Sequence, residues 1–197
     1  MFFKVLKYMN WFASQCRKVM YNMAFGTKFR YFGKGCTVDI RGKMQIGNNV
    51  YIGDHVSLIV ENGAVLEIAD NSFIGENCYI KCFGGKVSIG KDVSINSKSY
   101  INGCGGVTIG DNTRIGTQSI LIASNHKFGE PDLLVKDAIT KQGVSLGKNI
   151  WLGARVTVLD GVTIADDSVI GACSLVSKPL PESGVYVGIP AKKIKSV

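Results

Sequence analysis

The sequence contains few of the residues that hold metals or break regular structure. In 197 residues it has 2 His and 4 Pro, and none of its 6 Cys forms a Cys-x-x-Cys pair. A paired-cysteine metal site and a disulfide framework are therefore not expected, and reduced thiols in a cytoplasmic protein are the simplest interpretation. No apolar run reaches about 18 residues, so the sequence predicts no membrane-spanning helix. A hydrophobic content of 46% excludes a disordered or collagen-like chain.

Acidic residues are missing from the first 34 positions, which contain seven Lys or Arg. The remaining chain has 16 basic and 15 acidic residues, so the net charge of +8 comes almost entirely from this N-terminal segment. The charge therefore does not indicate nucleic-acid binding by the whole protein. Apolar residues recur at helical spacing over 2–23 and predict an amphipathic helix. We expect its apolar face to pack on the rest of the protein or on a neighbouring subunit. The alternative is peripheral contact of residues 1–30 with an anionic membrane, at its inner face.

The main feature of the chain is a repeat of six residues. Ile, Leu or Val recurs at this spacing in sets of three, and successive sets are separated by 10, 9, 8, 25 and 6 residues. Extra residues thus appear only after every third hexad, as expected if three hexads form one triangular turn of a solenoid with the aliphatic side chains stacked inside. The six sets are Ile46, Ile52, Leu58; Ile68, Ile74, Ile80; Ile89, Ile95, Ile101; Ile109, Ile115, Leu121; Leu146, Leu152, Val158; and Ile164, Ile170, Val176.

Two positions depart from the repeat. The residue after the second aliphatic of each set is Gly in five sets and Asn96 in one. We expect a corner there that needs unusual backbone angles, which Gly and Asn tolerate; an amide placed for function is the alternative. The second departure is the loop 122–144, which contains His126, one of the two histidines. The other, His55, is expected on the surface of the first turn.

The hexads themselves resemble a known family. VTIGDN (107–112), the long run NIWLGARVTVLDGVTIADDSVIGACSLVSKPLP (149–181) and GVYVGIPAKKIK (184–195) are similar to hexapeptide-repeat acyltransferases, and within them to sugar O-acetyltransferases of the galactoside, maltose and polysaccharide type. The resemblance covers roughly residues 38–195. It implies an all-β fold, a left-handed parallel β-helix (a hexapeptide-repeat solenoid), with an N-terminal amphipathic helix and one protruding loop. The expected organisation is a basic helical segment over 1–34, the β-helix over 35–180 and a tail over 181–197.

The resemblance also implies a homotrimer that binds acetyl-CoA and its acceptor between subunits. His126 lies at the matching point of the loop and is expected to take the proton from the acceptor hydroxyl, a task that imidazole suits at cellular pH. Asn96 matches an active-site Asn, and Trp151, which alternation turns outward beside the end of the loop, matches a Trp of the substrate tunnel. The positions that match the coenzyme A site are Ala154, Ala172 and Ser177 around the pantetheine arm and Lys178, Lys192 and Lys195 around the phosphates.

These features predict an acetyl-CoA-dependent O-acetyltransferase acting on a sugar of a cell-surface polysaccharide or its precursor. No metal is expected, because the γ-type carbonic anhydrases that share the repeat need three zinc-binding His and this chain has two. Acetylation of serine, an amino sugar or an antibiotic by the same fold is the nearest alternative. A non-catalytic β-helix scaffold is the alternative from another class.

Overall fold

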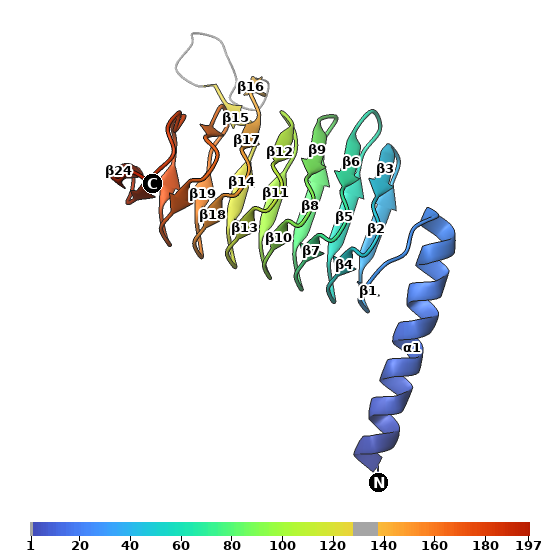
Figure 1. The fold of residues 1–197 in the computed structure, drawn as a ribbon. Helices are drawn as coiled ribbons and strands as arrows, with labels where there is room; N and C mark the ends of the chain where they lie inside the picture. The colour runs from blue at the N-terminus through green and yellow to red at the C-terminus, as the bar shows by residue number, and fades with distance from the viewer. Residues whose placement is uncertain (1, 128–137) are drawn as a thin grey trace.

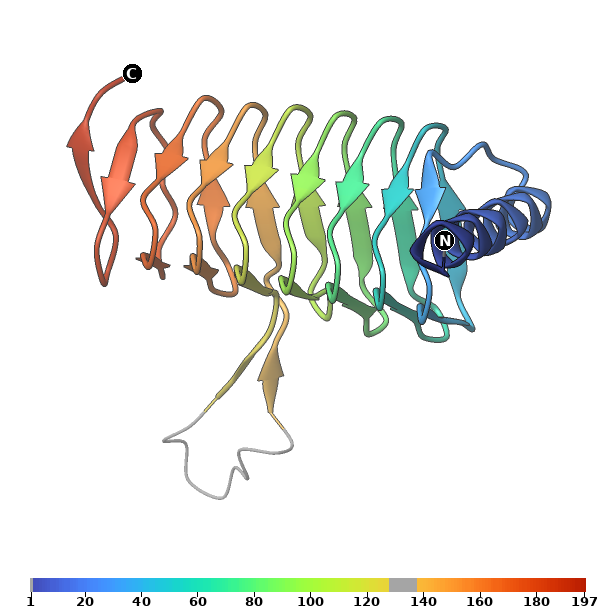
Figure 2. The ribbon, with the colours of Figure 1, turned by 90° about the horizontal axis from the view of Figure 1, so that it is seen from below.

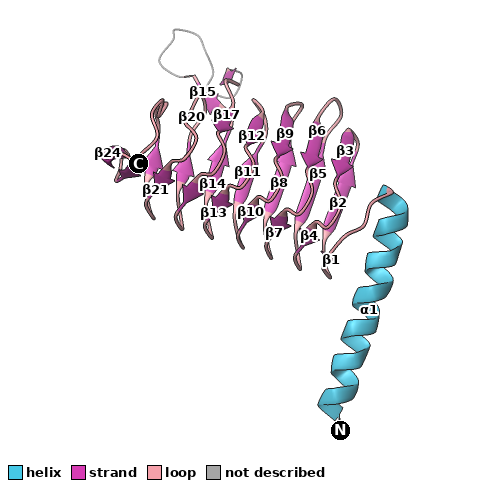
Figure 3. Cartoon of the chain, viewed as in Figure 1, coloured by secondary structure: helices cyan, strands magenta, loops and turns pink. Residues whose placement is uncertain are grey.

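The structure, a computed structural model, describes residues 2–127 and 138–197; within the first helix, side chains are described for Met9 and from Trp11 onward. One helix, α1 (Phe2–Phe25), precedes a solenoid of short strands that coil around a common interior, and the two ends of the chain lie at opposite ends of the molecule (Figure 1). Apart from α1, the described residues are strands, turns and loops (Figure 3). The expected parallel β-helix is confirmed.

Three sheets form the sides of the solenoid, and each of the first six turns contributes one strand to each sheet. Sheet A consists of β1 (Tyr31–Phe32), β4 (Tyr51–Ile52), β7 (Phe73–Ile74), β10 (Ser94–Ile95), β13 (Arg114–Ile115), β18 (Trp151–Leu152), β21 (Val169–Ile170), β23 (Val185–Val187) and β24 (Lys192–Lys195). Sheet B consists of β2 (Thr37–Ile40), β5 (Ser57–Val60), β8 (Tyr79–Cys82), β11 (Tyr100–Asn102), β14 (Ile120–Ile122), β19 (Thr157–Val158) and β22 (Leu175–Val176). Sheet C consists of β3 (Lys43–Ile46), β6 (Val65–Ile68), β9 (Lys86–Ile89), β12 (Val107–Ile109), β17 (Val144–Leu146) and β20 (Thr163–Ile164).

The register shows why the hexad forms this fold. Equivalent aliphatic residues of successive turns are direct partners in parallel ladders; Ile115, for example, lies between Ile95 and Leu152. Of the 18 aliphatic positions, 17 are buried, and Ile46 in the outermost strand of sheet C is half-buried. A single turn has no interior of its own, so the core exists only because each turn stacks on the next.

The corners differ from the sequence-based expectation. The glycines that follow the second aliphatic residue do not have positive φ; left-handed backbone occurs two residues later, at His55, Asn77, Lys98, Gln118, Arg155 and Cys173. What requires glycine is a close approach of turns. A Cβ on Gly116 would lie 2.5 Å from the backbone carbonyl carbon of Gly153, and one on Gly153 would lie 2.6 Å from the nitrogen of Ala172. The prediction of unusual angles at this position was therefore wrong, because the close approach of the next turn, not φ, favours glycine there, with Asn96 as the exception.

The helix also differs from expectation. Its last turns contact the first turn of the solenoid, where the ring of Tyr21 stacks on that of Phe32 at 3.7 Å between centroids. From there α1 extends away from the sheets (Figure 1), and Figure 2 shows the helix nearly end-on beside the first turn. The apolar side chains Met9, Phe12 and Met23 are 62%, 65% and 80% exposed. The apolar face of α1 therefore does not pack on the solenoid of its own chain, so that part of the prediction was wrong, while packing on a neighbouring subunit stays a prediction.

Candidate functional site

The single long break in the repeat is a hairpin at the edge where sheet B passes into sheet C. It leaves β14, forms the two-stranded pair β15 (Asn125–His126) and β16 (Ile139–Thr140), and returns to β17. Figure 1 shows this hairpin projecting from the solenoid wall; residues 128–137 of the predicted loop lie outside the described residues. The shorter insertions between other sets occupy the same edge in the neighbouring turns, as the spacing predicted.

His126 lies on β15, directly opposite Ile139 of β16. Its side chain is exposed, and its backbone N–H donates to Asn125 Oδ1 at 2.9 Å. The strands of the solenoid form continuous parallel sheets, so the two-stranded hairpin β15–β16 that carries His126 projects from a rigid wall. The imidazole therefore lies at the surface, on a hairpin outside the core.

The base of the hairpin is fixed by a carboxylate of the following turn. Asp160 accepts a hydrogen bond from the Thr140 hydroxyl at 2.8 Å through Oδ2 and one from the Gly143 N–H at 2.8 Å through Oδ1. The same Thr140 hydroxyl oxygen lies 3.3 Å from the carbonyl oxygen of Asn125, the residue before His126. The sequence analysis did not single out Asp160, because its role depends on which residue of the loop meets the next turn.

Asn96 lies at a different edge, where sheet A passes into sheet B. Its backbone φ is not positive, so corner geometry does not explain why Asn replaces the Gly of the other turns. The amide Nδ2 donates to the carbonyl of Ile115 in the next turn at 3.0 Å, while the residue as a whole is exposed. The side-chain amide thus bonds one carbonyl of the next turn and still lies at the surface.

The predicted coenzyme A positions divide between the same two edges and the end of the solenoid. Ala154 and Ala172 follow sheet A strands, as Asn96 does, whereas Ser177 and Lys178 follow β22 at the edge that carries the hairpin. Lys192 and Lys195 are exposed on β24. Among the described residues, no ion pair within 4.0 Å involves these three lysines, whereas their neighbour Lys193 pairs with Glu182 at 2.7 Å.

Trp151 begins β18, and its side chain is 60% exposed, on the outside of sheet A as alternation predicted. It lies between Arg114 and Val169 in register. The hairpin projects between sheets B and C, whereas Trp151 is on β18 of sheet A. Within one chain Trp151 is therefore not beside the loop, contrary to the sequence-based expectation. The spacing gave the length of the loop and the corner from which it projects, but not which of the three faces lies beside it.

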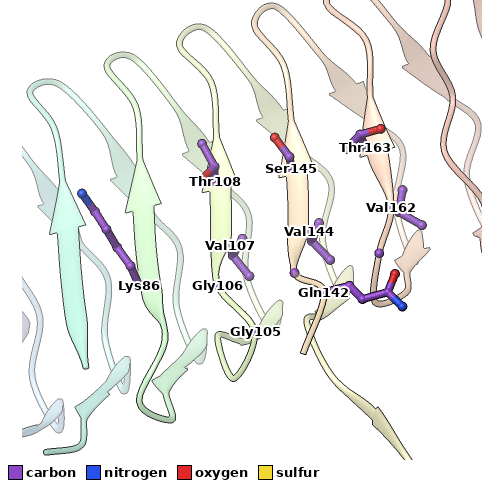
Figure 4. Close-up of a pocket in the computed structure, with 12 residues that line it drawn as sticks. Lys86, Gly105, Gly106, Val107, Thr108, Gln142, Val144, Ser145, Val162 and Thr163 are labelled. Atoms are coloured by element: carbon purple, nitrogen blue, oxygen red, sulfur yellow. The ribbon is translucent and has the colours of Figure 1, made fainter. Parts of the chain in front are cut away.

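A pocket of about 350 Å³ lies on the outside of sheet C, at the foot of the hairpin. Figure 4 shows Thr108, Ser145 and Thr163 side by side on successive strands, with Gln142 beside the hairpin base. None of the site residues predicted from the sequence lines it. The signal for this surface was present as small polar residues at the outward position of the last four first hexads, namely Ser88, Thr108, Ser145 and Thr163, but such residues are also ordinary on a solvated sheet.

Comparison with known proteins identifies the family. The family described as "Bacterial transferase hexapeptide (six repeats)" matches residues 143–178. The putative lipopolysaccharide biosynthesis O-acetyl transferase WbbJ of Escherichia coli is 31% identical, over 69% of this chain and 74% of that protein. The chain belongs to the bacterial hexapeptide-repeat transferases.

Two further comparisons define how far the similarity extends. The galactoside O-acetyltransferase of Escherichia coli is 32% identical over 63% of each chain, so this hexapeptide-repeat transferase spans less than two thirds of that relative. A solved structure of a mutant of AntD, an N-acyltransferase from Bacillus cereus, in complex with dTDP-4-amino-4,6-dideoxyglucose and coenzyme A, has a TM-score of 0.60 and 22% identity. It covers 91% of this chain and 88% of that one, and at this identity the likeness establishes the fold.

Proposed function

We propose that this protein transfers acetyl from acetyl-CoA to a hydroxyl group of a sugar, and that the acceptor belongs to a cell-surface polysaccharide or its precursor. The observation that carries the proposal is His126, exposed on the one hairpin that interrupts the solenoid of a hexapeptide-repeat transferase. The galactoside and lipopolysaccharide O-acetyltransferases among its relatives support a sugar hydroxyl as the acceptor.

The chemistry follows from the properties of an imidazole and a thioester. A hydroxyl is a weak nucleophile, and a base that removes its proton during attack accelerates the reaction by about 10²–10⁴-fold. In the proposed reaction, His126 accepts the proton of the acceptor hydroxyl while the oxygen bonds to the thioester carbonyl carbon. The carbon–sulfur bond then breaks, the acetyl ester is released, and the thiolate of coenzyme A leaves and takes up the proton. Asn96 is the proposed amide donor that orients the acceptor or stabilises the tetrahedral oxyanion.

The proposed site is completed by a second copy of the chain. His126 projects from the edge between sheets B and C, whereas Asn96, Ala154 and Ala172 follow the edge between sheets A and B. A cyclic trimer has heterologous interfaces, which place different surfaces of neighbouring copies together. We therefore propose a homotrimer in which the hairpin of one copy reaches sheet A of the next, where Trp151 and Asn96 lie.

Outward side chains support this assembly. Sheet C presents mainly Lys, Glu, Ser and Thr, a surface suited to water. Sheet A presents a stack of aromatic rings, with Tyr51 4.9 Å from Tyr31 and 4.6 Å from Phe73 between centroids, and sheet B presents Tyr79 stacked on Tyr100 at 5.5 Å. Aromatic residues are enriched in the cores of protein interfaces. Sheets A and B are accordingly the proposed contact faces.

The lysines fit the donor. Coenzyme A carries several phosphate charges, and Lys178, Lys192 and Lys195 present exposed ammonium groups at the end of the solenoid that contains the predicted pantetheine positions. Serine, amino-sugar and antibiotic acetylation share this donor and differ in the acceptor, while a scaffold would have no use for the donor.

The experiment is a coupled measurement of donor binding and turnover. Calorimetry with coenzyme A tests the donor site, and acetyl-CoA-dependent thiol release with sugars, oligosaccharides, glucosamine, serine and chloramphenicol tests the acceptor. We expect coenzyme A binding and turnover with a sugar hydroxyl. Turnover with an amine, serine or the antibiotic in place of sugars would replace the acceptor assignment, and absence of both binding and turnover would leave a scaffold.

A further inference from the structure

Helix α1 presents its apolar stripe to the outside. One face of the helix carries Met9, Phe12, Val19, Met20 and Met23, which follow one another at separations of three, seven, one and three residues and are 56–80% exposed. In the sequence, the same spacing continues to Phe2, Val5 and Leu6, whose side chains lie outside the described residues. We call Met9, Phe12, Val19, Met20 and Met23 the apolar stripe.

The attachment of α1 uses a different side of the helix. Tyr21 stacks on Phe32, Phe25 packs edge-on to Phe29 at 6.1 Å between centroids, and the Phe29 N–H donates to Asn22 Oδ1 at 2.8 Å. These contacts are confined to the last two turns, and the rest of α1 extends clear of the solenoid (Figures 1 and 2). The helix is therefore anchored in a defined orientation, with the apolar stripe turned away from its own core.

Charge indicates what covers the stripe. Residues 1–34 contain seven Lys or Arg and no acidic residue, and Lys28, Arg30 and Lys34, which follow the helix, are exposed. Packing several copies of α1 through their stripes would gather these cations with no carboxylate in the segment to pair with them. An anionic lipid surface supplies both an apolar layer for the stripe and negative charge for the cations.

We propose that α1 is an interfacial helix that binds an anionic membrane and holds the β-helix at its surface. The apolar stripe inserts into the boundary between headgroups and acyl chains, and the basic residues meet the headgroups. Such a helix lies on the membrane; no helix in the described part of the chain is long and apolar enough to cross one. This inference rests on α1 and its flanking cations, not on His126 or on the acetyl-transfer proposal.

The test is flotation with lipid vesicles. We expect the full chain to float with vesicles that contain phosphatidylglycerol, to bind phosphatidylcholine alone much more weakly, and to be released by salt. The double variant Met20→Gln, Met23→Gln should lower binding on the order of tenfold or more, because it removes exposed apolar side chains from the stripe. Its melting temperature should match the wild type, since neither side chain is in the core.

A second pair of variants isolates the charge. Lys28→Glu with Lys34→Glu should lower binding to phosphatidylglycerol vesicles, whereas Lys91→Glu with Lys98→Glu, an equal charge change at exposed positions on the solenoid, should leave it near the wild type. The proposal is overturned if the wild type floats with neither vesicle, if the methionine variant floats as well as the wild type, or if both charge pairs reduce binding equally. If the wild type does not bind vesicles and the methionine variant dissociates in sedimentation velocity, the apolar stripe contacts a second copy of the chain instead.

Discussion

Asp160 Oδ2 accepts a hydrogen bond from the Thr140 hydroxyl at 2.8 Å, which ties the return strand of the hairpin to the next turn of the solenoid. The same carboxylate accepts the N–H of Gly143 through its other oxygen. Because β16 pairs with β15, we expect these two hydrogen bonds to fix the position of His126 relative to the solenoid.

We expect Asp160→Asn to lower kcat about tenfold while the KM for acetyl-CoA changes little. An amide keeps one acceptor oxygen and so loses one of the two bonds, and a small displacement of a catalytic base is costly. The matched control is Asp70→Asn, since Asp70 Oδ1 accepts a backbone N–H from Asn48 at 2.7 Å in a turn remote from the hairpin. Equal losses in the two variants, or none in Asp160→Asn, would contradict a positioning role.

His126 and Asn96 occupy different edges of one chain, which makes a mixing experiment decisive. We expect His126→Ala and Asn96→Ala each to lose about a hundredfold or more in kcat as pure proteins. If each site combines the histidine of one subunit with the asparagine of the next, a quarter of the interfaces formed after co-refolding equal amounts are intact. Activity should therefore recover to about a quarter of the wild type. A mixture no more active than its components would show that both residues act within one chain.

The Asn96 amide has both a structural and a proposed catalytic role, which Asn96→Gly separates. Gly occupies the equivalent corner of the other turns, and the hydrogen bond to the Ile115 carbonyl is worth about 0.5–1.5 kcal/mol. We expect a small fall in melting temperature together with a large fall in kcat. If Asn96→Gly keeps wild-type turnover, the Asn96 amide serves the stability of the fold and not catalysis.

The interior of the fold was predictable because its signal is local and repeated. Each turn of the solenoid places residues such as Ile95, Ile115 and Leu152 directly above one another, so a spacing of six in the sequence becomes a column in space. The break at His126 was visible for the same reason, since a hairpin can leave such a stack only between hexads.

Other features depend on relations that spacing does not contain. The sequence could not show that the backbone of the next turn comes close to Gly116, because the residue that approaches it, Gly153, is 37 residues further along the chain. Nor could it show which side of α1 attaches, since Tyr21 meets Phe32 through an aromatic contact off the apolar stripe. Asp160 was missed because its hydrogen-bond partners, Thr140 and Gly143, lie within the longest gap in the repeat, where the spacing predicts no register.

Alkaline pH should weaken the first turn through Tyr31. Its hydroxyl donates to Asp54 Oδ1 at 2.8 Å, and burial together with this hydrogen bond raises the pKa of Tyr31 from 10.0 to about 12. Burial tends to raise the pKa of Asp54, but hydrogen bonds from Tyr31 and the Lys34 N–H outweigh it and hold that pKa below its ordinary value. The folded state thus favours a neutral tyrosine beside an ionised aspartate.

The sign follows from linkage. A group whose pKa is higher in the folded than in the unfolded state contributes stability that is complete below the unfolded pKa and is lost as the pH rises through the folded pKa. For Tyr31 that window runs from 10.0 to about 12. We expect Tyr31→Phe to melt a few degrees below the wild type near pH 8, because one hydrogen bond of about 1 kcal/mol is gone, and the difference to shrink toward pH 11. If the difference in melting temperature between the two proteins stays constant as the pH rises over this range, the ionisation of the Tyr31 hydroxyl is not coupled to folding.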